Sequence, residues 1–188
     1  MTPRRKRPPA RLAALPLAEA RRRASRIRLV LADCDGVLTD SGVFYGESGE
    51  ALKRFSIRDG MGVERLRLAG MESGMVSGEV SFSIARRAEK LAIRHVLLGV
   101  KDKRAALASL CLQEGLQLSE LAYIGDDVND VAVLDALASE GLTGAPRDAV
   151  PEVARRVHHR CRAAGGAGAF RDFAEWLLAL REASRRRA

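Results

Sequence analysis

The sequence predicts an α/β fold, in which a Rossmann-like parallel sheet carries helices on both faces and a small β-hairpin flap extends from it. Two observations lead to this prediction. Short apolar segments alternate along the chain with amphipathic segments of about ten residues or more, which is the pattern of βαβ units. Four successive apolar segments lead into polar or charged residues, namely Asp33, Ser77, Lys101 and Asp126. Because the carboxyl ends of parallel strands share one edge of a sheet, these residues are expected to meet there.

A single domain is expected over residues 26–180, since 188 residues with 47% apolar and 30% charged residues suit one packed core. Residues 1–25 form a basic arm that is expected to be disordered, although residues 17–26 could form a short helix, and residues 181–188 form a basic tail. Strands are predicted over residues 27–35, 74–76, 95–100, 121–127 and 142–146, and a hairpin over 38–55. A loop followed by a helix that stops at Gly70 is predicted over residues 56–70, and helices are predicted over 81–93, 101–114, 128–139 and 169–183.

The net charge of +8 is concentrated at the start of the chain, where residues 1–28 hold ten Lys or Arg residues against one Glu. The remaining residues are close to neutral, so the charge is assigned to solvated ends and no nucleic-acid partner is expected. With 4% aromatic residues, the chain also offers few stacking platforms for single-stranded nucleic acid. Nucleic-acid binding through the arginine-rich arm remains an alternative, to be tested by deleting residues 1–25.

Two further features predict a cytoplasmic protein with no membrane association. The cysteines, Cys34, Cys111 and Cys161, are scattered and odd in number, as expected for reduced thiols. No run of about 18 apolar residues occurs, and Pro16 interrupts the apolar patch near the N-terminus, which argues against a secretory signal.

The carboxylates at the predicted sheet edge indicate phosphate chemistry with a divalent cation. Three carboxylates close together repel one another, and Mg²⁺ with its preference for oxygen ligands would compensate them. Asp33 and Asp126 can supply side-chain oxygens and Asp35 its carbonyl, while Ser77 and Lys103 suit phosphate oxygens. Asp33 can attack phosphorus directly because a carboxylate is already ionised. Asp35, two residues on, is expected to point to the same side and to act as general acid and base.

Four motifs give the chain a resemblance to the haloacid dehalogenase superfamily of phosphatases. The segment DCDGVLTD, residues 33–40, is similar to the superfamily's DxDGxxTD signature. Ser77, Lys103 and GDDVND at residues 125–130 match the other three motifs in order. The segments at 46–63 and 165–172 resemble the small branch that acts on phosphorylated 2-keto-3-deoxy sugar acids. That branch includes 3-deoxy-D-manno-octulosonate 8-phosphate and nonulosonate 9-phosphate phosphatases.

This resemblance implies a Mg²⁺-dependent phosphomonoester hydrolase that forms an aspartyl-phosphate on Asp33. It also implies phosphate binding by Gly78 and supporting roles for Asp127 and Asp130. No cap domain is expected, because 43 residues separate Asp33 from Ser77 and 25 separate Ser77 from Lys103. The resemblance further implies a homotetramer, in which the flaps assist assembly and a neighbour's C-terminal segment helps to close each site.

The substrate is expected to be a sugar-acid phosphate, and five residues are assigned to its recognition: Arg58, Asp59, Glu79, Lys90 and Arg171. The octulosonate enzymes resemble ITGR at the second motif, whereas this chain has VSGE, so Glu79 replaces an arginine. Together with Lys90 this favours nonulosonate 9-phosphate, with Glu79 and Lys90 acting in one subunit or across an interface. The alternatives are octulosonate 8-phosphate hydrolysis in lipopolysaccharide biosynthesis and a non-catalytic partner of a sugar-activating cytidylyltransferase.

Overall fold

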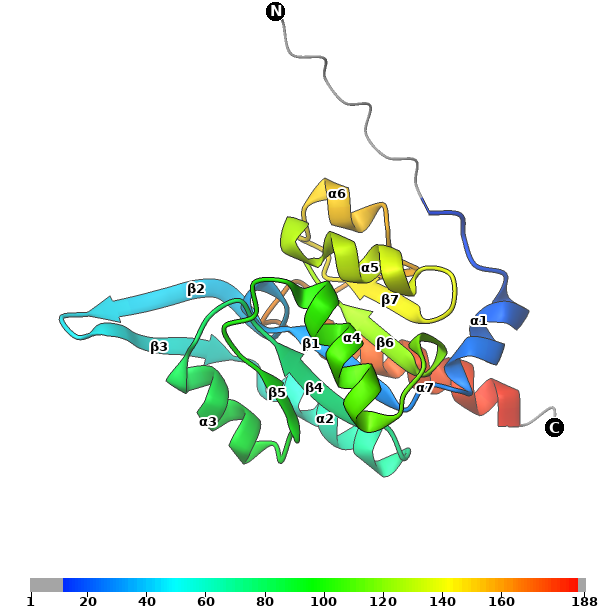
Figure 1. Ribbon diagram of the computed structural model, residues 1–188, viewed down its shortest axis with the longest axis horizontal. Helices are drawn as coiled ribbons and strands as arrows, with labels where there is room; N and C mark the ends of the chain where they lie inside the picture. Colours follow the sequence, from blue (N-terminus) through cyan, green and yellow to red (C-terminus); the bar gives the residue numbers. More distant parts are fainter. Residues whose placement is uncertain (1–11, 186–188) are drawn as a thin grey trace, which may run out of the picture.

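The structure, a computed structural model, describes residues 12–185 and contains a six-stranded parallel sheet and a separate two-stranded hairpin (Figure 1). The strand order of the sheet is β5-β4-β1-β6-β7-β8. The strands are β1 (Leu29–Asp33), β4 (Glu72–Val76), β5 (His95–Leu97), β6 (Leu121–Ile124), β7 (Leu142–Ala145) and β8 (His159–Arg160). The predicted α/β fold class is confirmed.

Helices cover both faces of the sheet, as alternation along β1 requires. Val30 and Ala32 face a core cluster that contains Leu66 of α2, whereas Leu29 and Leu31 face a cluster formed with α4 and α5. The helices are α1 (Leu17–Ala24), α2 (Ile57–Leu68), α3 (Phe82–Lys90), α4 (Lys103–Glu114), α5 (Val131–Leu137), α6 (Pro151–Ala154) and α7 (Ala169–Arg185). Within residues 12–185, no helix is long and apolar enough to cross a membrane.

The register of the sheet brings the ends of its central strands to one place. β1 pairs in parallel with β4, where Asp33 lies opposite Val76, and with β6, where Ala32 lies opposite Ile124. The residues that follow these strands therefore emerge at the same edge, as the sequence predicts.

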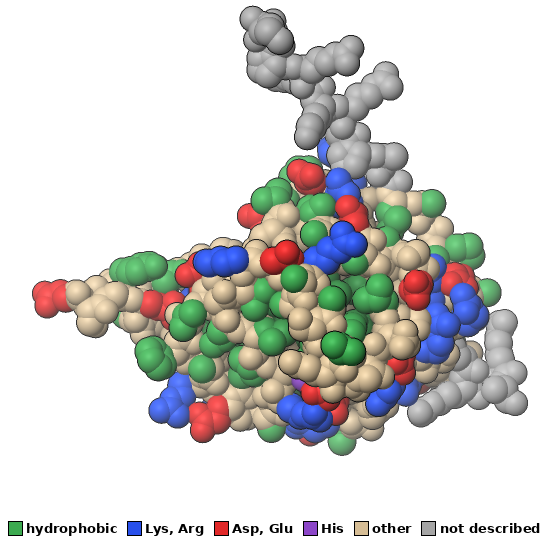
Figure 2. Space-filling model, viewed as in Figure 1, with side chains coloured by type: hydrophobic (Ala, Val, Ile, Leu, Met, Phe, Trp, Pro, Cys, Tyr) green, Lys and Arg blue, Asp and Glu red, His purple; other side chains and the backbone are tan. Residues whose placement is uncertain are grey.

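The hairpin of β2 (Thr39–Gly46) and β3 (Gly49–Phe55) forms an arm that projects from the body of the molecule (Figure 1). Large apolar side chains are exposed along it, including Phe44 at 60% and Tyr45 at 76%, and Figure 2 shows apolar side chains on this arm. An exposed apolar surface of this kind indicates a contact surface for another protein. We call this hairpin the flap.

The predicted boundary between arm and domain at residue 25 is wrong, because α1 packs into the domain. Ala20 and Ala24 are buried in the core. The buried guanidinium of Arg23 donates hydrogen bonds to the carbonyls of Ala138 and Gly141, at 3.0 and 3.1 Å. A deletion intended to remove the arm alone must therefore stop before α1.

Three further points concern the C-terminal helix, the shortest elements and the two ends of the chain. α7 continues through the start of the predicted tail at residues 181–188. α6 and β8 were not predicted, since they span four and two residues and are too short to show a periodicity. Residues 1–11, the first part of the segment predicted to be disordered, lie outside the described residues, as do 186–188.

We expect the protein to lose stability as the pH falls from about 6.5 to about 4, in part through His158. Burial lowers the pKa of His158 to about 4, and its Nδ1 accepts a hydrogen bond from the Thr143 amide at 3.1 Å. In this pH window the unfolded chain binds a proton that the folded chain does not, so folding becomes less favourable.

The effect of His158 is measured by urea unfolding of the wild type and His158→Gln at pH 7 and pH 5. The wild type should lose about 1 to 2 kcal/mol more than the variant between these pH values. An equal loss in both proteins would contradict this assignment.

Candidate active site

Asp33, the last residue of β1, is the centre of the site. Its side chain is almost completely buried, with the residue 4% exposed. Oδ1 accepts a hydrogen bond from the Cys34 amide at 2.7 Å, and Oδ2 lies 2.8 Å from Nζ of Lys103. Burial raises the pKa of Asp33 to about 7, with a further contribution from the charge of Asp130, while Lys103 opposes the rise.

Lys103 is buried and paired with two carboxylates. It is the first residue of α4, which the Asp102 side chain caps by accepting from the Ala105 amide at 3.0 Å. Its Nζ lies 2.7 Å from Oδ1 of Asp130 as well as 2.8 Å from Asp33. Burial alone would lower the pKa of Lys103, but the charges of Asp33 and Asp130 raise it above its usual value. Lys103 therefore remains a cation at the base of the site.

Asp130 is fully buried and serves as the anchor of this arrangement. Its Oδ1 accepts from the hydroxyl of Tyr123 at 2.6 Å in addition to Lys103. Its Oδ2 accepts from the amides of Asp126 and Asp127 at 2.9 and 3.3 Å. Because both oxygens are fully used, Asp130 orients Lys103 and the loop after β6, and it has no free lone pair directed at a ligand.

Asp126 follows β6, and its carboxylate lies close to that of Asp33. Burial, followed by the charges of Asp33 and Asp130, raises the pKa of Asp126 to about 8. Its Oδ1 is buried and has no hydrogen-bond partner within the described chain. An unpaired buried carboxylate oxygen is costly unless a cation or donor compensates it.

These residues fit a divalent cation. Oxygen atoms of Asp33, Asp126 and Asp130 lie within 4.8 Å of one another. Asp130 is occupied by protein donors, so Asp33 and the unpaired oxygen of Asp126 are the side-chain groups available to a metal. Hard oxygen donors in a small number suit Mg²⁺, which keeps several waters and binds substrate phosphate.

We expect Gly36→Ala to reduce kcat about a hundredfold. Gly36 lies in the turn Cys34–Leu38 with φ of +89°, and a β-carbon there would fall 2.0 Å from Oδ2 of Asp126. The collision would displace a carboxylate of the site, and steady-state kinetics measure the loss. Gly70→Ala is the matched control, since Gly70 also has a positive φ of +76° but an added β-carbon would meet no atom within 4 Å. An equal loss in both variants would contradict the prediction.

A cavity opens above Asp33 and collects most of the predicted residues. The loop after β4 forms one wall, where Oγ of Ser77 accepts from the Glu79 amide at 3.1 Å. The predicted residues that line the cavity are Asp33, Asp35, Ser77, Gly78, Glu79, Asp126 and Asp127, and they are joined by Ser41, Val128 and Asn129. Lys103 lies beneath this cavity, in contact with Asp33.

The four other residues assigned to substrate recognition lie outside this cavity lining. Asp59 is buried in α2 and accepts from the amides of Gly168 and Arg171, at 3.2 and 3.0 Å. It therefore joins α2 to the start of α7, and burial raises its pKa. Arg58 is exposed beside Gly168, and Lys90 is exposed in the last turn of α3. The roles of these four residues in specificity remain predictions.

Lys53 belongs to the site but was not predicted from the sequence. It lies on β3 of the flap, with its side chain 1% exposed, and its Nζ is 2.7 Å from Oδ2 of Asp35. Thr39 Oγ1 donates to the other oxygen of Asp35 at 3.1 Å. The chain offers no spacing signal for Lys53, since it is one of two adjacent cations, with Arg54, on a hairpin that is otherwise largely exposed.

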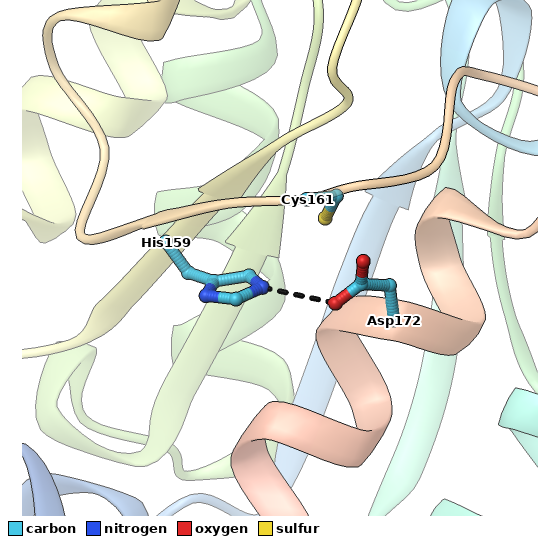
Figure 3. A group of neighbouring side chains, drawn as sticks. All are labelled: His159, Cys161 and Asp172. Carbon is cyan, nitrogen blue, oxygen red and sulfur yellow. Dashed lines mark hydrogen bonds and ion pairs between the residues drawn. The ribbon is translucent and has the colours of Figure 1, made fainter.

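A second group of potential metal ligands, His159, Cys161 and Asp172, joins β8 and the following segment to α7 (Figure 3). His159 Nε2 is 3.1 Å from Oδ1 of Asp172, and Oδ2 accepts from the Arg162 amide at 2.7 Å. Cys161 Sγ donates to the carbonyl of Ala169 at 3.3 Å, and burial raises the pKa of this thiol. Since the members are bonded within the protein, we interpret the group as a structural link.

An aspartate pair at the end of β1, a buried lysine and an acidic loop after β6 on a parallel sheet define a haloacid dehalogenase-type phosphatase.

Comparison with known proteins identifies the family within this class. The 3-deoxy-D-manno-octulosonate 8-phosphate phosphatase KdsC of Haemophilus influenzae is 39% identical over 152 residues, 81% of this chain and 83% of that protein. The Escherichia coli K12 protein of the same description is 34% identical over 156 residues, 83% of this chain and 81% of that protein. The chain belongs to the KdsC family of phosphomonoester hydrolases.

Solved structures agree with this family. The enzyme from Moraxella catarrhalis, in complex with magnesium, phosphate and KDO, matches with a TM-score of 0.80 and 31% identity over 89% of this chain and 95% of that chain. The cobalt-bound enzyme of Haemophilus influenzae matches with a TM-score of 0.80 and 36% identity over 86% and 93%. No protein-family model matches the chain. The predicted superfamily and enzyme class are thus confirmed, and a divalent metal is bound in both of these solved structures.

Proposed function

We propose that the protein is a Mg²⁺-dependent phosphatase of 3-deoxy-D-manno-octulosonate 8-phosphate that forms an aspartyl-phosphate on Asp33. The observation that carries the proposal is a buried carboxylate, Asp33, 2.8 Å from the ammonium of Lys103 in an acidic cavity. The substrate is supported by relatives of 34 to 39% identity that carry this description. The positive charge of Lys103 beside the acidic cluster suits phosphoryl transfer, which depends mainly on positioning and charge.

The metal would be held by carboxylate oxygens of Asp33 and Asp126 and by the backbone carbonyl of Asp35. The unpaired Oδ1 of Asp126 supports this set. When bound, the cation neutralises negative charge on the phosphate and on the carboxylates around it.

The side chains of the site divide the reaction between them. An oxygen of Asp33 attacks phosphorus, and the bond from phosphorus to the sugar oxygen breaks as the new bond forms. Lys103, Ser77 and Gly78 bind the phosphate oxygens and stabilise their charge. Asp35 gives its proton to the departing sugar oxygen, and it later takes a proton from the water that attacks the aspartyl-phosphate. Inorganic phosphate and the free sugar acid are the products.

Two further acids support these groups. Asp130 holds Lys103 in place through the 2.7 Å ion pair. Asp127 caps the turn after β6 by accepting from the Val128 amide at 2.6 Å, and it lines the cavity beside Asp126.

Nonulosonate 9-phosphate is the second candidate substrate, and one observation favours it. Glu79 lines the cavity where an arginine is expected in an octulosonate enzyme. The relatives support octulosonate 8-phosphate more strongly than this one residue supports the longer sugar, so the octulosonate assignment leads. Lys90, Arg58 and Arg171 remain candidates for contacts with the sugar, in this subunit or across an interface.

The test is kcat/KM for octulosonate 8-phosphate and nonulosonate 9-phosphate, measured side by side with and without Mg²⁺. A preference of about tenfold or more for octulosonate 8-phosphate supports the proposal, and corresponds to about 1.4 kcal/mol of transition-state binding. The opposite preference would assign the enzyme to the nonulosonate. Absence of metal-dependent turnover of either substrate would favour the non-catalytic partner of a cytidylyltransferase.

We further propose that the protein is a homotetramer in the cytoplasm, with the flap forming part of the contact between copies. The flap, the loop before α3 and the first residue of α3 expose large apolar side chains that a second copy would cover. These side chains are Val43, Phe44, Tyr45, Leu52, Val80 and Phe82. Light scattering should show a tetramer for the wild type and smaller species for Phe44→Ser. A monomeric wild type would contradict this proposal.

A further inference from the structure

Lys53 stands out among the cations of the flap because it is buried. Within β3 it is the one buried residue, and its side chain is 1% exposed. Lysine is rarely buried unless its charge is paired. Its Nζ lies 2.7 Å from Oδ2 of Asp35 and 3.7 Å from Oε2 of Glu50. Burial alone would lower the pKa of Lys53, but these two carboxylates raise it.

The Asp35 carboxylate is thereby held from two sides. Thr39 Oγ1 donates to Oδ1 from the end of the turn, and Lys53 binds Oδ2 from the flap. Asp33, by contrast, is bound by Lys103. Each aspartate of the pair therefore has its own lysine, one from α4 beneath the cavity and one from the flap.

The flap is also attached to the opposite wall of the site. Glu50, which contacts Lys53, accepts a hydrogen bond from Oγ of Ser81, the residue that caps α3. The series Asp35, Lys53, Glu50 and Ser81 thus links the turn after β1 to the loop after β4. The flap position and the orientation of Asp35 are connected by these contacts.

We propose that Lys53 is a positioning residue that orients the Asp35 carboxyl group for proton transfer to the leaving group. This inference rests on the phosphatase function proposed above. The Nζ of Lys53 is paired with the carboxylates of Asp35 and Glu50, so Lys53 acts on the reaction through Asp35. Proton transfer needs donor and acceptor within hydrogen-bond reach, so a misplaced Asp35 loses this contribution.

The role of Lys53 predicts a dependence on the leaving group. When Asp33 attacks a sugar phosphate, the departing alkoxide oxygen takes the electron pair of the broken bond to phosphorus and needs the proton of Asp35. A p-nitrophenolate departs as a stable anion and needs no proton. Because kcat/KM reports the steps through phosphoryl transfer to Asp33, a loss of acid catalysis lowers it for the sugar phosphate and leaves it nearly unchanged for p-nitrophenyl phosphate.

The test compares wild type, Lys53→Met and Lys53→Arg with octulosonate 8-phosphate and p-nitrophenyl phosphate. We expect Lys53→Met to lose about a hundredfold in kcat/KM with the sugar phosphate and less than about fivefold with the aryl phosphate. Lys53→Arg keeps the cation and should recover most of the lost activity. Arg54→Met is the matched control, since Arg54 is an exposed flap cation paired with Asp40.

Each outcome decides the inference. An equal loss with both substrates would show a structural role for Lys53 and overturn the proposal, as would no loss with either. If Lys53→Met does not fold, Lys53→Gln takes its place in the same comparison. If the wild type cleaves the aryl phosphate but no sugar-acid phosphate, the proposed substrate is wrong, and an unactivated alkyl phosphate replaces it in the test of Lys53.

Discussion

Asp33→Asn is expected to lower kcat by at least about 10⁴-fold with any phosphate ester that the enzyme cleaves. A carboxamide cannot attack phosphorus as a carboxylate does, and it is a weaker ligand for a cation. The fold should survive, because asparagine has nearly the shape of aspartate and Lys103 keeps its ion pair with Asp130 at 2.7 Å. Phosphate release measured beside urea unfolding separates loss of catalysis from loss of folding.

The control for this variant is Asp135→Asn, the same change at an exposed position of α5 that pairs with Arg156. It should keep wild-type activity. The free energy of unfolding of Asp33→Asn should fall by less than about 1 kcal/mol relative to the wild type. Phosphatase activity of Asp33→Asn within tenfold of the wild type would contradict its assignment as nucleophile.

Lys103→Met is expected to lower the free energy of unfolding by about 3 to 5 kcal/mol at pH 7 and to remove most of the activity. Lys103 is 3% exposed and neutralises Asp33 and Asp130, which lie at 2.8 and 2.7 Å. Methionine keeps the apolar stem but leaves two buried carboxylates facing each other without a cation. Denaturant unfolding in the absence of metal measures the effect on stability.

Arg104→Met is the matched control, because Arg104 is the next residue of α4 and its side chain is exposed. Removing this surface cation should change the free energy of unfolding by less than about 0.5 kcal/mol. Equal stabilities for Lys103→Met and Arg104→Met would mean that the buried ion pairs contribute little to the fold.

The residues of the site could be predicted because polar and charged side chains are not expected directly after buried apolar strands. A carboxylate directly after an apolar strand is costly, and parallel topology places such residues together. Asp33, Asp126 and Ser77 were found in this way, and their positions follow from the register of β1 with β4 and β6. The turn with Gly36 was recognised as a motif, but its collision with Asp126 becomes visible only in three dimensions.

Other features depend on contacts that no local pattern reveals. Lys53 lies 18 residues from Asp35, on an exposed hairpin, and its burial results from the path of the flap. Asp59 was assigned to substrate recognition, and the sequence did not predict its hydrogen bonds to the start of α7, more than a hundred residues away in the chain. α1 was included in a disordered arm because most of its residues are charged or small. The burial of Ala20 and Ala24 could not be predicted from that composition. Substrate choice depends on exposed side chains, and the hydrophobic pattern of the sequence does not show which of them bind the substrate.

The central claim is a covalent aspartyl-phosphate on Asp33. Its most direct test is rapid mixing of the enzyme with octulosonate 8-phosphate and Mg²⁺, followed by acid quenching and mass spectrometry of the peptide that contains Asp33. We predict one added phosphoryl group on this peptide in the wild type during turnover, and none in Asp33→Asn. Turnover without phosphate on Asp33, or with phosphate on another residue, would contradict the mechanism.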